Sequence, residues 1–125
     1  MLLVEDEPAV RAVISGYLRE GGFRVLEAAD GAEALGVLAR ERPDLVVTDL
    51  TMPHMGGAEL AGRIDELFCG DLPVVFVTGY AQEELGSSSR PWSVLQKPFS
   101  RAELAAHLRG VLAELPAQPR RAQGL

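Results

Sequence analysis

Short apolar runs alternate with amphipathic segments along this chain, and the alternation predicts buried strands separated by helices. Runs that stay apolar at successive positions are typical of parallel strands covered on both faces. A segment that alternates polar and apolar residues is typical of an edge strand. We therefore expect five strands, an edge strand at Arg24–Ala28 and four apolar runs at Leu2–Val4, Leu45–Thr48, Val74–Val77 and Val94–Leu95.

Apolar residues at helical spacing occupy the segments between the strands. Pro8 suits the first turn of a helix, and Gly21-Gly22 would end that helix. Asp30 with Glu33 has the spacing of a capping box, and so does Ser100 with Glu103. Four apolar stripes predict helices: Val10, Ile14, Tyr17 and Leu18; Leu35 and Leu38; Leu60, Ile64, Leu67 and Phe68; Leu104, Leu108, Val111, Leu112 and Leu115.

Alternating strands and helices joined by right-handed crossovers predict an α/β fold, a (βα)5 domain with a doubly wound, flavodoxin-like, five-stranded parallel sheet in the order 2-1-3-4-5. Between Tyr80 and Pro91 only AQEEL has helical character before GSSSRP, so the fourth helix should be short or mobile. The end, PAQPRRAQGL, lacks apolar periodicity. We expect one domain over residues 1–115 and a disordered tail or linker over 116–125.

Composition excludes several classes of function. With 125 residues and 47% hydrophobic content the chain is long enough to bury a core, but its net charge of −6 argues against direct binding of nucleic acid. No apolar stretch approaches the roughly 20 residues of a membrane span. The single cysteine cannot form an internal disulfide. We therefore expect a cytoplasmic protein without membrane insertion, present as a monomer or weak dimer.

Residues suited to phosphate chemistry follow four of the predicted strands: Glu5 and Asp6, Asp49, Thr78 and Lys97. In a doubly wound sheet ligands bind beyond the carboxyl ends of the strands, so these side chains should meet in one crevice. Lys97 is the only lysine, since the other eleven basic residues are arginines. The combination indicates an aspartate that accepts a phosphoryl group.

We expect the oxygen ligands to bind a cation, and the lysine and threonine side chains to contact the transferred phosphoryl group. Mg²⁺ prefers carboxylates, waters and phosphate oxygens, so we expect Asp6 and Asp49 as direct ligands, Glu5 acting through a water, and the backbone carbonyl near Thr51 completing the set. Asp49 would be the nucleophile, while the Lys97 ammonium and the Thr78 hydroxyl would neutralise or bind the oxygens of the transferred group.

The motifs LLVEDEP, DGAEAL, PDLVVTDLTMPHMGG, PVVFVTGYA and LQKPFS resemble the receiver domain of bacterial two-component response regulators, over about residues 1–115. The resemblance implies that Asp49 is the phosphoacceptor, that Glu5 and Asp6 are the acidic metal-binding pair, and that Thr78 and Lys97 contact the phosphate. It also implies a sensor histidine kinase or a histidine phosphotransfer protein as partner. The TGY motif is also familiar from receivers attached to sensor kinases.

One departure from the family concerns the signal. Many receivers have a Tyr or Phe on the last strand, three residues before the lysine, and here that position is Val94. The usual aromatic switch is therefore absent, and Tyr80 is a candidate to replace it beside Thr78.

Three alternatives stay open at this stage. A haloacid-dehalogenase-like phosphatase also uses Asp, Lys, Thr and Mg²⁺, but its nucleophile normally follows the first strand in a DxD pattern, where this chain has EDE. A receiver-like interaction module that no longer signals would not need the complete acidic set. A flavin-binding relative would need a glycine-rich phosphate loop. The favoured interpretation is a phosphoacceptor that is not a turnover enzyme.

Overall fold

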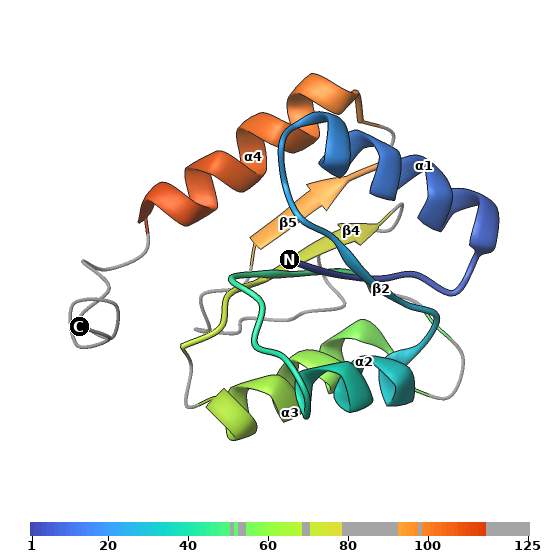
Figure 1. The fold of residues 1–125 in the computed structure, drawn as a ribbon, viewed down its shortest axis with the longest axis vertical. Coiled ribbons are helices and arrows are strands. Elements are labelled where there is room, and N and C mark those ends of the chain that lie inside the picture. The colour runs from blue at the N-terminus through green and yellow to red at the C-terminus, as the bar shows by residue number, and fades with distance from the viewer. Residues whose placement is uncertain (51, 53–54, 69–70, 79–92, 98, 115–125) are drawn as a thin grey trace.

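The five strands form a single parallel sheet in the order β2-β1-β3-β4-β5 (Figure 1). The computed structural model describes residues 1–50, 52, 55–68, 71–78, 93–97 and 99–114. Strand bounds are β1 (Leu2–Val4), β2 (Leu26–Ala28), β3 (Val46–Asp49), β4 (Val74–Thr78) and β5 (Ser93–Gln96). The predicted doubly wound sheet and its strand order are confirmed.

Helices cover both faces of this sheet. In the described part of the chain they are α1 (Pro8–Glu20), α2 (Gly31–Leu38), α3 (Gly57–Phe68) and α4 (Arg101–Glu114). Figure 1 shows α1 and α4 on one face and α2 and α3 on the other. The short fourth helix predicted from the sequence falls within residues 79–92, and the predicted tail covers 116–125; both lie outside the described residues.

Two apolar clusters lie on the two faces, which explains why the central strands are mostly apolar before their carboxyl ends. Successive side chains of a strand point to opposite faces. Leu2 and Val4 accordingly pack toward α2 and α3, whereas Leu3 packs toward α1 and α4. These three side chains are fully buried.

Capping residues start the helices as the sequence predicts. The Asp30 carboxylate accepts a hydrogen bond from the Glu33 N–H at 2.8 Å, and the Glu33 carboxylate accepts from the Ala29 N–H. Ser100 and Glu103 form a reciprocal capping box, with distances of 2.7 and 3.0 Å.

One predicted core position is wrong. Leu67 was expected in the apolar stripe of α3, but it is 62% exposed. The buried face of this helix extends from Leu60 and Ile64 round to Ala61 and Asp65, on the side of Ile64 away from Leu67. The spacing of large apolar residues therefore placed the centre of the buried face too close to Leu67.

Candidate functional site

Three carboxylates meet where β1 and β3 end. Glu5 and Asp6 follow β1 directly, and Asp49 is the last residue of β3. Because Val4 pairs with Thr48 in the parallel register, the next residues of the two strands lie side by side. One carboxylate oxygen from each of the three residues lies within 4.8 Å of the others. The structure thus brings together the acidic residues predicted from the sequence.

Lys97 reaches this cluster from the turn after β5. Its Nζ lies 3.7 Å from Glu5 Oε1 and 3.7 Å from Asp49 Oδ2. The ammonium therefore faces one carboxylate of each strand. Its contact with Glu5, and not only with Asp49, goes beyond the expectation that it neutralises a bound phosphoryl group.

Glu5 is buried, with 1% of its surface exposed. Its Oε2 accepts a hydrogen bond from the Glu7 N–H at 3.2 Å. Loss of hydration, with a smaller contribution from the Asp49 charge, raises the pKa of Glu5 to about 7, although the Glu7 N–H and Lys97 oppose the rise. In the described part of the chain no hydrogen-bond donor reaches Oε1. A buried carboxylate oxygen that lacks a donor and faces two other carboxylates fits a site for a cation.

Gly57 allows the start of α3 to approach the end of β3. A Cβ atom at Gly57 would lie 2.3 Å from the Asp49 carbonyl oxygen and 2.9 Å from Leu50 Cα. The Gly57 N–H also donates to the Leu50 carbonyl at 2.8 Å. Sequence reasoning missed this role, and its only signal was the glycine pair in the PHMGG motif.

Arg11 is a second residue near the site that sequence reasoning missed. Its Nη1 donates a hydrogen bond to the Glu5 carbonyl oxygen at 2.8 Å. In the sequence, Arg11 resembles any other arginine on the polar face of a helix. The contact depends on how the turn between β1 and α1 folds, which the pattern of polar residues does not encode.

Three predicted residues are placed only in part or not at all, and Val94 is placed without a test of its role. The backbone of Thr78 ends β4, one residue beyond Val77, which pairs with Asp49. The side chain of Thr78, and Thr51 and Tyr80 as a whole, lie outside the described part of the structure. Val94 is partly buried in β5 opposite Phe76 and packs against the cluster on the side of α2 and α3. The roles assigned to these residues therefore stay predictions.

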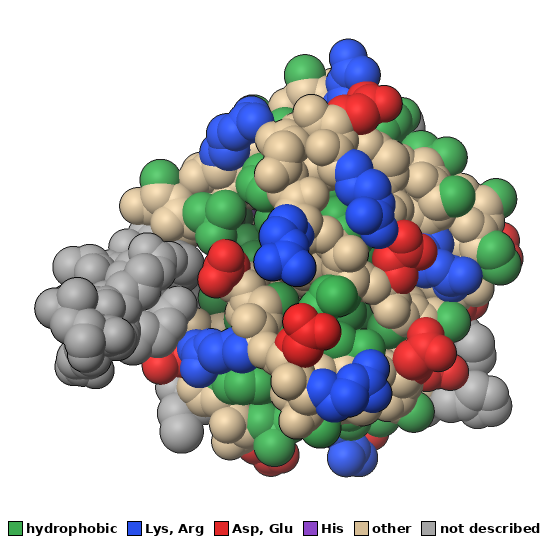
Figure 2. Space-filling model, viewed as in Figure 1, with side chains coloured by type: hydrophobic (Ala, Val, Ile, Leu, Met, Phe, Trp, Pro, Cys, Tyr) green, Lys and Arg blue, Asp and Glu red, His purple; other side chains and the backbone are tan. Residues whose placement is uncertain are grey.

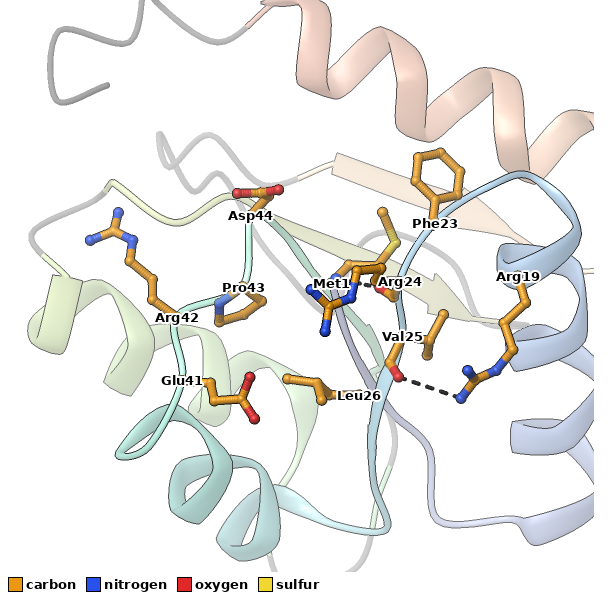
Figure 3. Close-up of a pocket in the computed structure, with 10 residues that line it drawn as sticks. All are labelled: Met1, Arg19, Phe23, Arg24, Val25, Leu26, Glu41, Arg42, Pro43 and Asp44. Atoms are coloured by element: carbon orange, nitrogen blue, oxygen red, sulfur yellow. Dashed lines mark hydrogen bonds between the residues drawn. The ribbon is translucent and has the colours of Figure 1, made fainter. Parts of the chain in front are cut away.

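A pocket of about 560 Å³ lies at the opposite edge of the sheet, where β1, β2 and β3 begin. Figure 2 shows basic and acidic side chains interspersed on this face, so it carries no patch of one charge. In Figure 3 the pocket is lined by Met1 and Arg24, whose backbones are joined by a hydrogen bond of 2.6 Å, and by Asp44. It is separate from the carboxylate cluster.

Known proteins are similar to this chain in sequence and in fold. The phosphate regulon transcriptional regulatory protein PhoB of Pseudomonas aeruginosa is 35% identical over 117 residues, which are 90% of this chain and 51% of that protein. The receiver domain of hybrid histidine kinase CckA is 36% identical with a TM-score of 0.75, covering 89% of this chain and 96% of that one. The receiver domain of sensor histidine kinase PA1611 from P. aeruginosa, with a magnesium ion coordinated in its active site cleft, is 32% identical with a TM-score of 0.80, covering 90% and 96%.

The doubly wound sheet, with acidic residues and a lysine at the carboxyl ends of its strands, defines the class of this protein as a flavodoxin-like α/β domain. The chain belongs to the response regulator receiver domain family, whose family model matches residues 1–109. It spans about half the length of several of the curated relatives that it matches.

None of these comparisons supports the phosphatase or flavin-binding alternatives. No helix in the described ranges is long and apolar enough to cross a membrane.

Proposed function

We propose that this chain accepts a phosphoryl group on Asp49, with Mg²⁺ bound at the carboxylate cluster, and relays it as a signal. The observation that supports the proposal most strongly is the convergence of Glu5, Asp6 and Asp49 within 4.8 Å, with Lys97 beside them. Family membership supports the same function, because receiver domains act in two-component signalling.

The residues present fit a divalent cation. Asp6 and Asp49 would bind it directly, the Thr51 carbonyl would add a third oxygen, and Glu5 would act through a water. The bound ion would reduce the repulsion between carboxylates and phosphate oxygens. The three carboxylates carry more negative charge than the Lys97 ammonium balances, and Glu5 Oε1 is buried and accepts no hydrogen bond from the described residues, so a further positive partner would stabilise this cluster.

Phosphoryl transfer would begin with an Asp49 carboxylate oxygen attacking the phosphorus of a phosphohistidine. The new P–O bond forms as the P–N bond breaks, and the electron pair leaves with the imidazole nitrogen, which takes up a proton. Little covalent chemistry is asked of the protein, so alignment and charge neutralisation supply most of the acceleration. Lys97 would move from its present carboxylate partners toward a phosphoryl oxygen, and the Thr78 hydroxyl would donate to another.

The phosphodonor in this proposal is a sensor histidine kinase or a histidine phosphotransfer protein. Both of the similar structures described above are receivers of histidine kinases, one of them a hybrid kinase. Because Val94 cannot act as an aromatic switch, Thr78 and Tyr80 would carry the conformational change. A cytoplasmic location, a monomeric or weakly dimeric state, the absence of direct nucleic-acid binding and the absence of turnover on a separate substrate are further parts of the proposal.

Labelling with a small phosphodonor such as acetyl phosphate tests the proposal. Wild-type protein should gain one phosphoryl group in Mg²⁺, detected by intact mass, and EDTA should prevent the gain. Asp49→Ala should not be labelled. Asp44→Ala is the matched control, because Asp44 is exposed at the opposite edge of the sheet, and it should be labelled as the wild type is. Equal labelling of both variants would refute the assignment of Asp49.

A further inference from the structure

The peptide group between Glu5 and Asp6 connects the two acidic residues that follow β1. The Glu5 N–H donates to the Ala28 carbonyl at 3.1 Å, which continues the pairing of β1 with β2. The Glu5 carbonyl instead accepts from Arg11 Nη1 of α1 at 2.8 Å. Since a peptide group is planar, the orientation of this carbonyl also sets the direction in which the backbone enters Asp6. Arg11 therefore contacts the peptide group that joins the two acidic residues.

Glu27 of β2 holds Arg11 from the other side. Arg11 Nε lies 3.4 Å from Glu27 Oε1. The other oxygen of Glu27 accepts hydrogen bonds from Ser15 Oγ at 2.9 Å and from Arg19 Nη2 at 3.2 Å. The hydrogen bond from Ser15, together with the nearby arginines, lowers the pKa of Glu27, which stays ionised at neutral pH. The guanidinium of Arg11 is thus fixed between a charged carboxylate and the Glu5 carbonyl.

The planar guanidinium suits this double contact. Nη1 and Nε point in different directions from one rigid group, so a single side chain can contact both Glu5 and Glu27. A lysine at position 11 has one nitrogen atom and would satisfy only one of the two partners well. Because only 22% of the Arg11 side chain is exposed, its contacts are partly shielded from solvent.

We propose that Arg11 is a positioning residue for cation binding, which orients Glu5 and Asp6 through the Glu5 carbonyl and is itself oriented by Glu27. The proposal rests on the proposed function, since it concerns the Mg²⁺ that the carboxylate cluster would bind. Arg11 does not contact the cation. It acts as the outer partners of a metal site do, by fixing the groups that supply the ligands.

A purely electrostatic role for Arg11 predicts the opposite result. Removing a positive charge near three carboxylates should strengthen the binding of Mg²⁺, because the cluster becomes more negative. Removing a positioning contact should weaken the binding, because the carboxylates lose their fixed directions. The sign of the change in affinity therefore distinguishes the two roles.

The test compares Arg11→Gln with Arg19→Gln. Each substitution removes one positive charge from a side chain that contacts Glu27, but of the two arginines only Arg11 also contacts Glu5. The half-saturating Mg²⁺ concentration is measured from the rise in thermal midpoint and, independently, from the rate of acetyl phosphate labelling. Arg11→Gln should raise this concentration by about 10-fold or more. Its labelling rate at saturating Mg²⁺ should stay close to that of the wild type. Arg19→Gln should leave the half-saturating concentration unchanged or lower it.

Two further variants complete the design. Arg11→Lys should restore part of the lost affinity, because the ammonium can still donate to one partner. Glu27→Gln should weaken Mg²⁺ binding in the same direction as Arg11→Gln, by a smaller factor. If circular dichroism shows that Arg11→Gln does not fold without metal, Arg11→Lys decides the question, because it keeps the positive charge and loses one of the two contacts: a half-saturating Mg²⁺ concentration above that of the wild type supports the positioning role, and an unchanged one overturns it.

Each result has one interpretation. The positioning role would be overturned if the half-saturating Mg²⁺ concentration of Arg11→Gln is no higher than that of the wild type and of Arg19→Gln. The proposed function would remain intact in that case. Equal effects of the two arginine substitutions would overturn it as well, because only Arg11 contacts Glu5. A wild-type protein that shows neither Mg²⁺ stabilisation nor labelling would instead refute the proposed function, and the positioning role with it.

Discussion

Replacing Glu5 by glutamine should remove a pH-dependent loss of stability in metal-free protein. A free glutamate has a pKa of 4.5, whereas burial raises the pKa of Glu5 to about 7 in the folded state. Between these values the unfolded chain has released a proton that the folded protein retains. Rising pH therefore favours unfolding, and the stability that Glu5 contributes below pH 4.5 is lost as the pH passes through about 7.

The magnitude follows from the interval between the two pKa values. At about 1.4 kcal/mol for each pH unit, the interval from 4.5 to about 7 corresponds to a loss of about 3 kcal/mol in the free energy of unfolding. Glutamine is nearly isosteric and does not ionise. The stability of Glu5→Gln relative to the wild type should therefore increase by about 3 kcal/mol between pH 4.5 and pH 8.

Urea unfolding monitored by circular dichroism in EDTA, at about pH 4.5 and about pH 8, measures this difference. Glu66→Gln is the charge-matched control, because Glu66 lies exposed on α3, and it should follow the wild type at both pH values. Saturating Mg²⁺ should stabilise the wild type more than Glu5→Gln at about pH 8. The reasoning is refuted if the two proteins lose stability in parallel as the pH rises in EDTA.

Three other predictions follow from the same site and its support. Asp49→Asn should raise the metal-free thermal midpoint, by about 4 °C for each 1 kcal/mol of relieved repulsion from Glu5 and Asp6, and a lower midpoint would contradict the repulsion. Gly57→Ala should destabilise by about 3 kcal/mol in urea, because its Cβ would meet the Asp49 carbonyl. Gly62→Ala, in the same helix with open space around it, should instead stabilise by about 0.5–1 kcal/mol, and similar effects of the two substitutions would exclude the steric cause.

The parts of the fold that follow from local patterns were predicted well from the sequence. Leu2–Val4 and the run around Val46 are apolar because both faces of the sheet are covered, and this periodicity is visible without any structure. Asp30 and Ser100 predict the starts of two helices, because each is followed three positions later by a glutamate that completes a capping box. The topology then places Glu5, Asp6, Asp49 and Lys97 together, because parallel strands all end at the same edge.

The parts that depend on close packing were not predictable from these patterns. Leu67 is exposed although its spacing fits a helical stripe, because the small residue Ala61 and the polar residue Asp65 also lie on the buried face. The fit of Gly57 against the Asp49 carbonyl depends on the distance between α3 and β3. The contact of Arg11 with Glu5 depends on one rotamer and one turn. Three-dimensional distances of this kind leave no periodic signal in a single sequence.

Locating the phosphoryl group in labelled wild-type protein tests the central claim most directly. After reaction with acetyl phosphate in Mg²⁺, peptide mass spectrometry should find the group on Asp49, at no more than one group for each chain, and should find no label when EDTA replaces Mg²⁺. Label of comparable extent on another residue, such as Glu5 or Asp6, or label on Asp49 that does not depend on Mg²⁺, would contradict the account.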